Sequence, residues 1–347
     1  MNLVPDFAKK DIDNFNDGKD WQIVKQVHID SLFRKDYLTT NSSNFLYEMP
    51  ETIKNVMIMR LVTIEVPNTW YQITERNNIF RINTHYAVPL LNPDGTPLLD
   101  ESDNQVINGP INHIITIPPG NYSAGDLTAF IQGFFDVNND LQYMVIEVDD
   151  FNSKTTFRFK SADELAVDFD VDTVENIIIN LRQYFTYSVY FDHQKPVCIE
   201  RPEYETIGWQ FGFRKLKYEN ITYDGFTNVK FQSVFNGVLE SEGIFGANKL
   251  NYTFLCVNDF NSNSRENIIT GLGNKTHINK DILSRITIKY GSFFVNLDAG
   301  DNVFRERHYG GPVNIDRLQF KLIDKYGNLL DLNGSDWSCI IEFLCLR

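Results

Sequence analysis

The residue types that could support catalysis or bind a metal are scattered through this sequence. The six histidines form no HxH, HExxH or facial-triad spacing: His28, His85, His113, His193, His277 and His308. No GxSxG or GxGxxG pattern occurs, and GLGNKT at 271–276 lacks the GxxxxGK spacing of a phosphate-binding loop. Nothing here assembles a nucleophile, a base or a cofactor loop. We therefore predict no catalytic residue, no cofactor-binding residue and no metal site.

The four cysteines also argue against metal or redox chemistry. They show no CxxC spacing: Cys198, Cys256, Cys339 and Cys345. The N-terminus is polar and has no apolar core of a signal peptide, and no apolar run is long enough to span a membrane. We expect synthesis in the cytosol and free, buried thiols in a reducing compartment.

Acidic residues gather in two places. Asp168, Asp170 and Asp172 would alternate on a strand predicted over 167–172, about 6.6 Å apart and parallel, whereas calcium needs converging oxygens. We interpret that strand as a solvated face. The loop predicted over 86–113 is a long surface insertion of the kind that often carries contacts; calcium or a partner could bind there, although its acidic residues match no EF-hand pattern. Its acidic residues include Asp94, Asp100, Glu101 and Asp103.

Aromatic residues suggest a binding surface or a core. Trp70 and Tyr71 follow the end of a predicted strand, where they could anchor a protein partner, stack on sugars or pack inside. Trp209 and Phe213 are better explained as core. The candidate partner contacts are therefore Trp70, Tyr71, Asp94, Asp100 and Glu101.

Composition limits the class of partner. Of 347 residues, 42% are hydrophobic, which is enough for a sizeable core, and the formal net charge is −14. Binding nucleic acid requires a basic surface that neutralises phosphates, so direct contact with DNA or RNA is disfavoured.

Alternating apolar residues predict strands along most of the chain. They cover 44–50, 56–67, 78–83, 143–150, 155–161, 249–260, 282–290, 292–298, two runs that flank the turn at 324–328 as a hairpin, and the run SCIIEFL at 338–344. In 56–67, the set Val56, Ile58, Arg60, Val62, Ile64 and Val66 is expected to face the core, as are Leu318, Phe320 and Leu322 near the C-terminus.

Two helices are predicted among these strands. One begins after an N-cap at Ser123 and buries Leu127, Phe130, Ile131 and Phe134, and the other covers 173–185. The pattern indicates an all-β fold, an antiparallel jelly-roll β-sandwich with one or two short helical insertions and long loops. We assign 1–25 to an extended N-terminal arm and 26–347 to one elaborated domain.

Five stretches, in the same order, resemble a known family. They are SSNFLYEMPETIKNVMIMRLVTIEVPNTWYQI (42–73), ITIPPGNYSAGDLTAFI (115–131), IGWQFGFRK (207–215), LCVNDFN (255–261) and GGPVNIDRLQFKLIDKYGNLLDLNGSDWSCIIEF (310–343). Together they are similar to the jelly-roll minor capsid proteins of nucleocytoplasmic large DNA viruses, over about residues 30–345. The acidic insertion at 86–113 and the arm at 1–25 depart from that family.

The resemblance implies a structural role as a penton or minor capsid component in the virion, after synthesis in the host cytoplasm. It implies contacts with the major capsid protein, other minor capsid proteins and copies of itself, as a pentamer in the penton case. Vertex and lattice positions both stay open. Two alternatives remain: a carbohydrate- or receptor-binding module of a spike base, and a β-sandwich hydrolase with paired carboxylates, for which no pair stands out.

Overall fold

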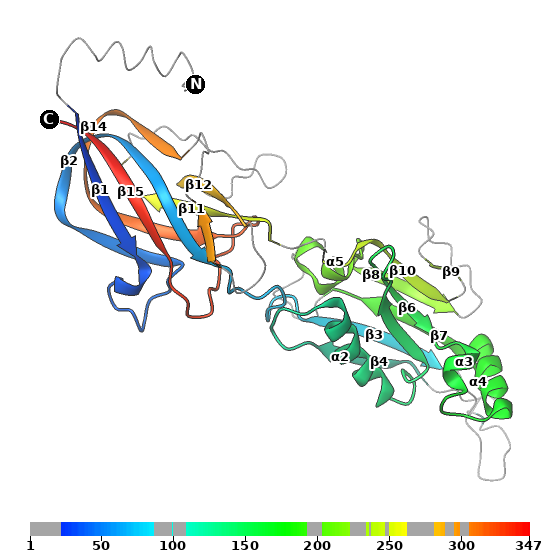
Figure 1. Cartoon of the computed structure of the whole chain (residues 1–347). Helices are drawn as coiled ribbons and strands as arrows, with labels where there is room; N and C mark the ends of the chain where they lie inside the picture. Colours follow the sequence, from blue (N-terminus) through cyan, green and yellow to red (C-terminus); the bar gives the residue numbers. More distant parts are fainter. Residues whose placement is uncertain are drawn as a thin grey trace. The chain divides into compact units, whose positions relative to one another are not determined.

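The chain folds into two compact units, each with its own apolar core (Figure 1). The computed structural model describes residues 22–86, 109–192, 203–222, 237–246, 250–261, 281–288 and 305–347, with Leu99 and the short strands 234–235 and 295–298. The first unit combines 1–70 with 250–347, and the second is 71–249. We expected a single domain over 26–347. Local periodicity does not reveal that the middle of the chain closes its own core.

The first unit contains a seven-stranded antiparallel sheet within the described residues. Its order is β1 (Gln22–Asp30), β15 (Ser338–Leu346), β2 (Asn44–Pro67), β14 (Glu306–Ile323), β11 (Tyr252–Asn258) and β12 (Ile282–Thr287), with β13 (Val295–Asp298) also paired to β2. Strand β1 therefore includes residues 22–25, which we had assigned to the N-terminal arm, and residues 1–21 lie outside the described residues.

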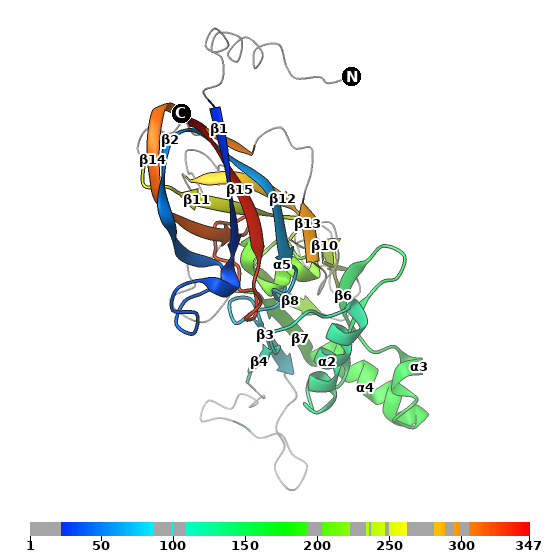
Figure 2. The ribbon, with the colours of Figure 1, turned by 60° about the vertical axis from the view of Figure 1, so that its left-hand side comes forward.

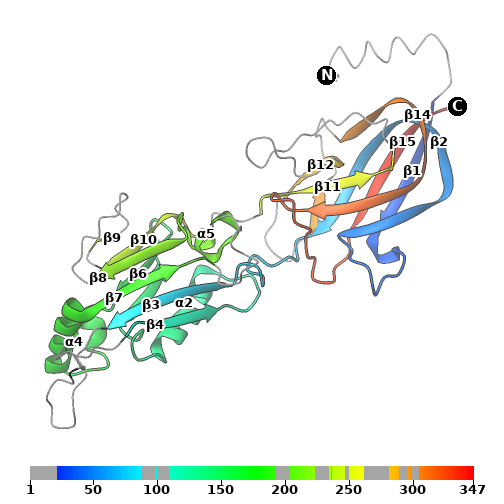
Figure 3. The ribbon, with the colours of Figure 1, turned by 180° about the vertical axis from the view of Figure 1, so that it is seen from behind.

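Strands β2 and β14 form a long ribbon that bends in the middle, as Figures 2 and 3 show. At the bend, residues 309–312 of β14 lie opposite Met57 alone, a bulge that includes the sequence Gly310-Gly311-Pro312. Asn55 takes a positive φ of 57° there, and its backbone N–H donates to Asn314 Oδ1 at 3.2 Å. In one half of the ribbon, β15 pairs with β2 on the side away from β14. In the other half, β11 pairs with β14 on the side away from β2. The bend therefore folds the sheet over one core.

A buried ion pair lies next to this bend. Arg307 Nη1 lies 3.0 Å from Asp259 Oδ2, and the Tyr309 hydroxyl donates to the same oxygen. Arg307 Nη2 also donates to the Asp281 carbonyl at 3.1 Å. Burial, with the nearby carboxylate of Asp259, raises the pKa of Tyr309. These contacts join the start of β14 to the residue after β11 and to the residue before β12, beside the bulge.

Bulges also change which residues of β2 face the core. Against β15, the pairs Cys345–Val56 and Leu344–Ile58 enclose one extra β2 residue, and Ile341–Leu61 and Ile340–Thr63 enclose another. Each extra residue reverses the alternation of inward and outward side chains along β2. Met59 and Leu61 are therefore buried, whereas we had predicted that Ile58, Arg60 and Val62 would face the core. Val56, Ile64 and Val66 are buried as predicted.

The C-terminal prediction is confirmed for the core residues. Leu318, Phe320 and Leu322 are fully buried, and Phe320 stacks on Phe45 with ring centroids 5.5 Å apart. After the turn at Asp324–Asn328, the chain makes only a bridge between Ile323 and Leu329 before β15. Strand β15 then pairs with β2 and β1 and not with β14.

The second unit packs two four-stranded antiparallel sheets around an aromatic core. One runs β5 (Met144–Val148), β6 (Lys154–Phe159), β10 (Val238–Ile244) and β9 (Val234–Phe235). The other runs β4 (Ile111–Thr116), β3 (Ile79–Tyr86), β7 (Phe185–Tyr190) and β8 (Lys217–Thr222). The two units together confirm the predicted all-β, antiparallel, jelly-roll-like class.

Four α-helices accompany the strands in the described part of the chain: α2 (Ala124–Asp136), α3 (Ala162–Leu165), α4 (Val171–Tyr184) and α5 (Ile207–Phe211). Ser123 caps α2 as predicted, and the helix buries Leu127, Ile131 and Phe135. Phe130, predicted to be buried, is 41% exposed because the inward residues follow a strict four-residue spacing.

One stretch differs from its predicted conformation, and another turns sharply through close packing at glycines. Residues 167–172 do not form a strand, because Asp170 caps α4 by accepting from the Thr173 N–H at 2.9 Å. In 208–215, helix α5 ends at Gly212, whose φ of 95° favours glycine. A Cβ on Gly208 would lie 2.3 Å from Phe191 Cγ, so this glycine lets the aromatic core close.

Arg158 on β6 joins α3 to the β5–β6 hairpin. Its guanidinium donates to both carboxylate oxygens of Glu164, at 2.7 and 2.8 Å, and to Glu147 at 2.9 and 3.0 Å. Glu164 also completes a capping box with Ser161 at the start of α3. The hydrogen bond from Arg158 is the main reason that the pKa of Glu164 falls to about 2.

Replacing Phe320 by Ala should lower the free energy of unfolding by roughly 3–5 kcal/mol, because it leaves a cavity between Phe45 and Trp337. Chemical denaturation of the full chain measures the loss. Phe151→Ala is the matched control: Phe151 is fully exposed, so we expect a change within about 0.5 kcal/mol. An unchanged melting temperature with blocked assembly for Phe320→Ala would show that this face is an interface.

Glu164 should make stability depend on acid pH. Because its folded pKa lies below the unfolded value, its contribution is present above pH 4.5 and is lost as pH falls towards 2. Glu164→Gln should be less stable than wild type at neutral pH, and the difference should shrink across that window. Thermal melts of both proteins from pH 7 to pH 2 test this, and a pH-independent difference would exclude the ionic contribution.

Candidate assembly surface

Two of the five residues predicted to contact a partner, Trp70 and Tyr71, lie among the described residues. Trp70 is 8% exposed and belongs to the core of the first unit, which is the packing alternative considered for it. Tyr71 is 38% exposed and stays a candidate contact. Asp94, Asp100 and Glu101 lie outside the described residues. The burial of Trp70 removes its indole from the sugar-stacking alternative, in which Tyr71 remains.

The titratable groups give no constellation typical of an enzyme in the described ranges. His113 Nε2 lies 2.7 Å from Asp140 Oδ2, and the Thr84 hydroxyl donates to the same oxygen. A histidine that activates a hydroxyl must contact that hydroxyl, whereas here both groups contact the acid. No group of three His, Cys, Asp or Glu residues that could hold a metal occurs there.

The described cysteines are buried thiols. Cys256, Cys339 and Cys345 are all free and inaccessible, and Cys198 lies outside the described residues. Burial, the main cause, raises the pKa of Cys256 to about 12, which suppresses the nucleophilic thiolate.

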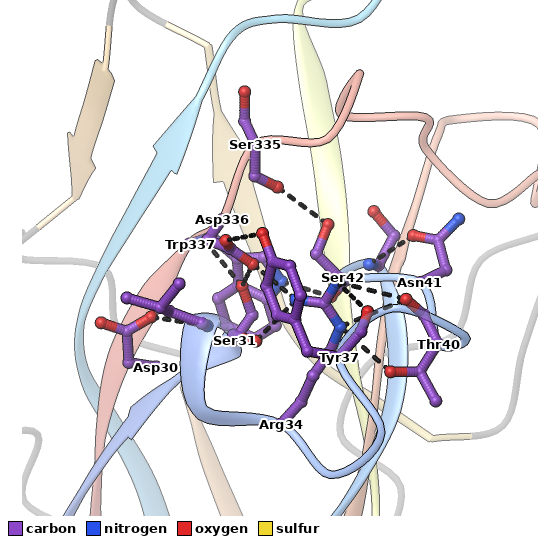
Figure 4. A network of polar contacts seen from close by, with 12 residues as sticks. Asp30, Ser31, Arg34, Tyr37, Thr40, Asn41, Ser42, Ser335, Asp336 and Trp337 are labelled. Carbon is purple, nitrogen blue, oxygen red and sulfur yellow. Dashed lines mark hydrogen bonds and ion pairs between the residues drawn. The ribbon is translucent and has the colours of Figure 1, made fainter.

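The loop between β1 and β2, residues 31–43, is held by a polar network around Arg34 and Asp336 (Figure 4). The Arg34 side chain is only 7% exposed, and its Nη1 lies 2.6 Å from Asp336 Oδ1. The same carboxylate accepts from Ser31 Oγ at 2.7 Å and from the Tyr37 hydroxyl at 3.1 Å. One acid from the segment before β15 thus fixes three positions of the loop.

Arg34 also satisfies the loop's own carbonyl groups. Its guanidinium donates to the carbonyls of Ser31 at 2.7 Å, Tyr37 at 3.1 Å and Thr40 at 3.2 Å. It stacks over the Tyr37 ring, 4.0 Å from the centroid. A planar group with five N–H donors can make all these contacts at once, which a lysine cannot.

The loop is joined to the core through Trp337. The Ser31 N–H donates to the Trp337 carbonyl, and the Trp337 N–H donates to Ser31 Oγ, each at 2.9 Å. The Trp337 indole N–H donates to the Ser42 carbonyl at 2.7 Å, and its ring packs against Phe45 and Phe320. Both ends of the loop are therefore tied to one buried aromatic cluster.

This rigid loop exposes apolar side chains. Leu32 is 49% exposed, Phe33 81% and Leu38 94%, and we call these three residues the apolar loop tip. Burying one such side chain in an interface is worth about 1.5–3 kcal/mol. Because the network already orders the backbone, little conformational entropy remains to be lost on binding. Exposed apolar residues on an ordered support are typical of protein contact sites.

Sequence reasoning missed the loop tip. The stretch Ser31–Asn41 has apolar residues without helical or strand periodicity, so it gives no signal of burial or exposure. The nearest clue is an arginine close to aromatic and aliphatic residues in a loop, which does not identify Asp336 as its partner. Among the described residues, no helix has the length and apolar character needed to cross a membrane.

Comparisons with known proteins give structural matches only. No family model matches the sequence, and no curated protein does. A solved structure of the mavirus penton protein is 8% identical, with a TM-score of 0.44, and the match covers 94% of this chain and 100% of that one. A chain of the Sputnik virophage structure is 11% identical, with a TM-score of 0.40, covering 94% and 98%.

Replacing Asp336 by Asn should lower the free energy of unfolding by about 3 kcal/mol, because it leaves the buried Arg34 guanidinium without a countercharge. Arg34→Lys should also destabilise, because it keeps the charge but loses the contacts to the loop carbonyls. Denaturation measures both changes, and hydrogen exchange should show faster exchange confined to 31–43.

Lys35→Ala is the matched control for these variants. Lys35 is the next residue, and its exposed pair with Glu48 spans 3.9 Å, so we expect a loss below about 1 kcal/mol. Equal effects of Lys35→Ala and Asp336→Asn would contradict the role given to the buried network.

Proposed function

We propose that this protein is a structural component of an icosahedral virus capsid, acting as a penton or minor capsid protein. The five stretches of sequence that resemble minor capsid proteins, and that occur in the same order as in those proteins, support the capsid assignment. The antiparallel sandwiches with ordered loops are in keeping with it, since they offer rigid surfaces for neighbours in a shell.

The observation that carries the assembly role is the apolar loop tip on its buried network. An isolated protein gains nothing from holding Phe33 and Leu38 in water on an ordered backbone. In a shell, the same side chains would enter an apolar pocket of a neighbouring protein. Arg34 and Asp336 would then act by positioning the tip, without touching the partner.

The proposed partners are the major capsid protein, other minor capsid proteins and copies of this chain. In a pentamer, the tip of one copy would meet a different patch on the next, since rings with cyclic symmetry above two-fold use heterologous interfaces. The net charge of −14 favours protein contacts over contacts with packaged DNA. We propose no enzymatic role, and the place of action is the virion.

The double substitution Phe33→Asp with Leu38→Asp should abolish association while leaving the fold intact. A carboxylate in an apolar pocket is strongly disfavoured, but both positions are exposed in the free chain. Mass photometry of the full chain, alone and mixed with purified major capsid protein, measures association. Melting temperature measures the fold.

Val137→Asp is the control, because Val137 is 79% exposed at the end of α2, in the other unit. It should leave both association and melting temperature unchanged. Association of the double variant at the wild-type level would contradict the assembly role of the tip. A wild-type chain that stays monomeric and ignores the capsid protein would contradict the proposed function itself.

A further inference from the structure

Helix α4 in the second unit carries exposed apolar residues beside its buried face. Val174 and Leu181 are buried, and Ile177 packs against the same core. Val171 is 71% exposed and Ile179 55%, and these two positions lie about 80° apart around the helix, with Glu175 between them. Val167, in the turn before α4, is 83% exposed. The apolar residues of an amphipathic surface helix are normally buried against its core, so apolar residues exposed beside that buried face indicate a second packing partner.

The surroundings of this outer face are acidic. Residues 161–184 contain six carboxylates and one guanidinium, which gives a formal charge of −5. Glu164 is neutralised by Arg158, and Asp170 caps α4. Asp163 and Asp172 lie in first helical turns, where a carboxylate favours the helix dipole. Asp168 and Glu175 serve neither purpose, and both are exposed.

From these observations, we infer that the outer face of α4, formed by Val167, Val171, Glu175 and Ile179, docks a basic amphipathic segment of a partner protein. Apolar side chains of the segment would cover the valines and the isoleucine, and its lysines or arginines would face the carboxylates. This inference concerns a different surface and unit from the loop tip, and it does not depend on the capsid role.

Charge decides between the classes of occupant. Nucleic acids and anionic lipid surfaces carry phosphates, which this acidic rim repels. A second copy of this chain is also a poor match overall, because it carries a net charge of −14. A cationic, amphipathic protein segment complements both the exposed apolar residues of this face and the carboxylates around them.

The test uses the full chain and a synthetic helical peptide with lysine and leucine, the leucines forming one stripe. Fluorescence anisotropy should show binding that weakens with added salt, and a scrambled peptide without the stripe should bind at least about tenfold more weakly. Val171→Ser with Ile179→Ser, and separately Asp168→Asn with Glu175→Gln, should each raise Kd by about tenfold or more.

The control variant combines Val137→Ser with Asp150→Asn, an exposed apolar and an exposed acidic position elsewhere in the same unit. It should bind like wild type. Equal affinity for the striped and scrambled peptides would reduce the effect to non-specific attraction and overturn the inference. So would the absence of binding to the wild-type chain, or unchanged binding by both α4 variants. The charge variant keeps every buried residue, so it decides the matter even if the apolar variant folds poorly.

Discussion

The bent ribbon of β2 and β14 is the constraint on which the first unit depends. Two long strands stay paired through a corner only if residues are inserted there, and the bulge at 309–312 with the positive φ of Asn55 provides this. The bend brings the two halves of one sheet over a common core, in which Phe45 and Phe320 stack. Trp337 packs on the same pair, so the loop that carries the exposed tip is anchored to the structure that the bend creates.

Sequence patterns predicted the parts of the fold that depend on local residue types. Most strands, the Ser123 cap and the burial of Phe320 follow from alternation and capping chemistry. The buried face of β2 could not be predicted past its bulges, because each extra residue exchanges the two faces and depends on the partner strand β15. Asp170 shows the same limit at the start of a helix. It caps α4 only because the residues after it are helical, whereas the alternation of acidic residues over 167–172 is also typical of a strand.

The candidate surface depends even more on long-range contacts. Arg34 and Asp336 are 302 residues apart in sequence, and only their pairing makes 31–43 an ordered loop with Phe33 outside. Trp70 was ambiguous because the same residue type serves cores and interfaces, and its burial is decided by the strands around it. The outer face of α4 was equally hidden, since a run of isoleucines at 177–179 does not say which member points to the core.

The two proposed contact surfaces lie on separate units, and together they would give this protein more than one way to contact neighbours, as the proposed role in a shell requires. The most direct test of the proposed capsid role is the copy number of the protein in purified virus particles, by quantitative mass spectrometry relative to the major capsid protein. The capsid role predicts a fixed stoichiometry, about 60 copies per particle if pentamers occupy every vertex and a higher number for a lattice position. Particles without the protein, with all of it free in extracts of infected cells, would contradict that role.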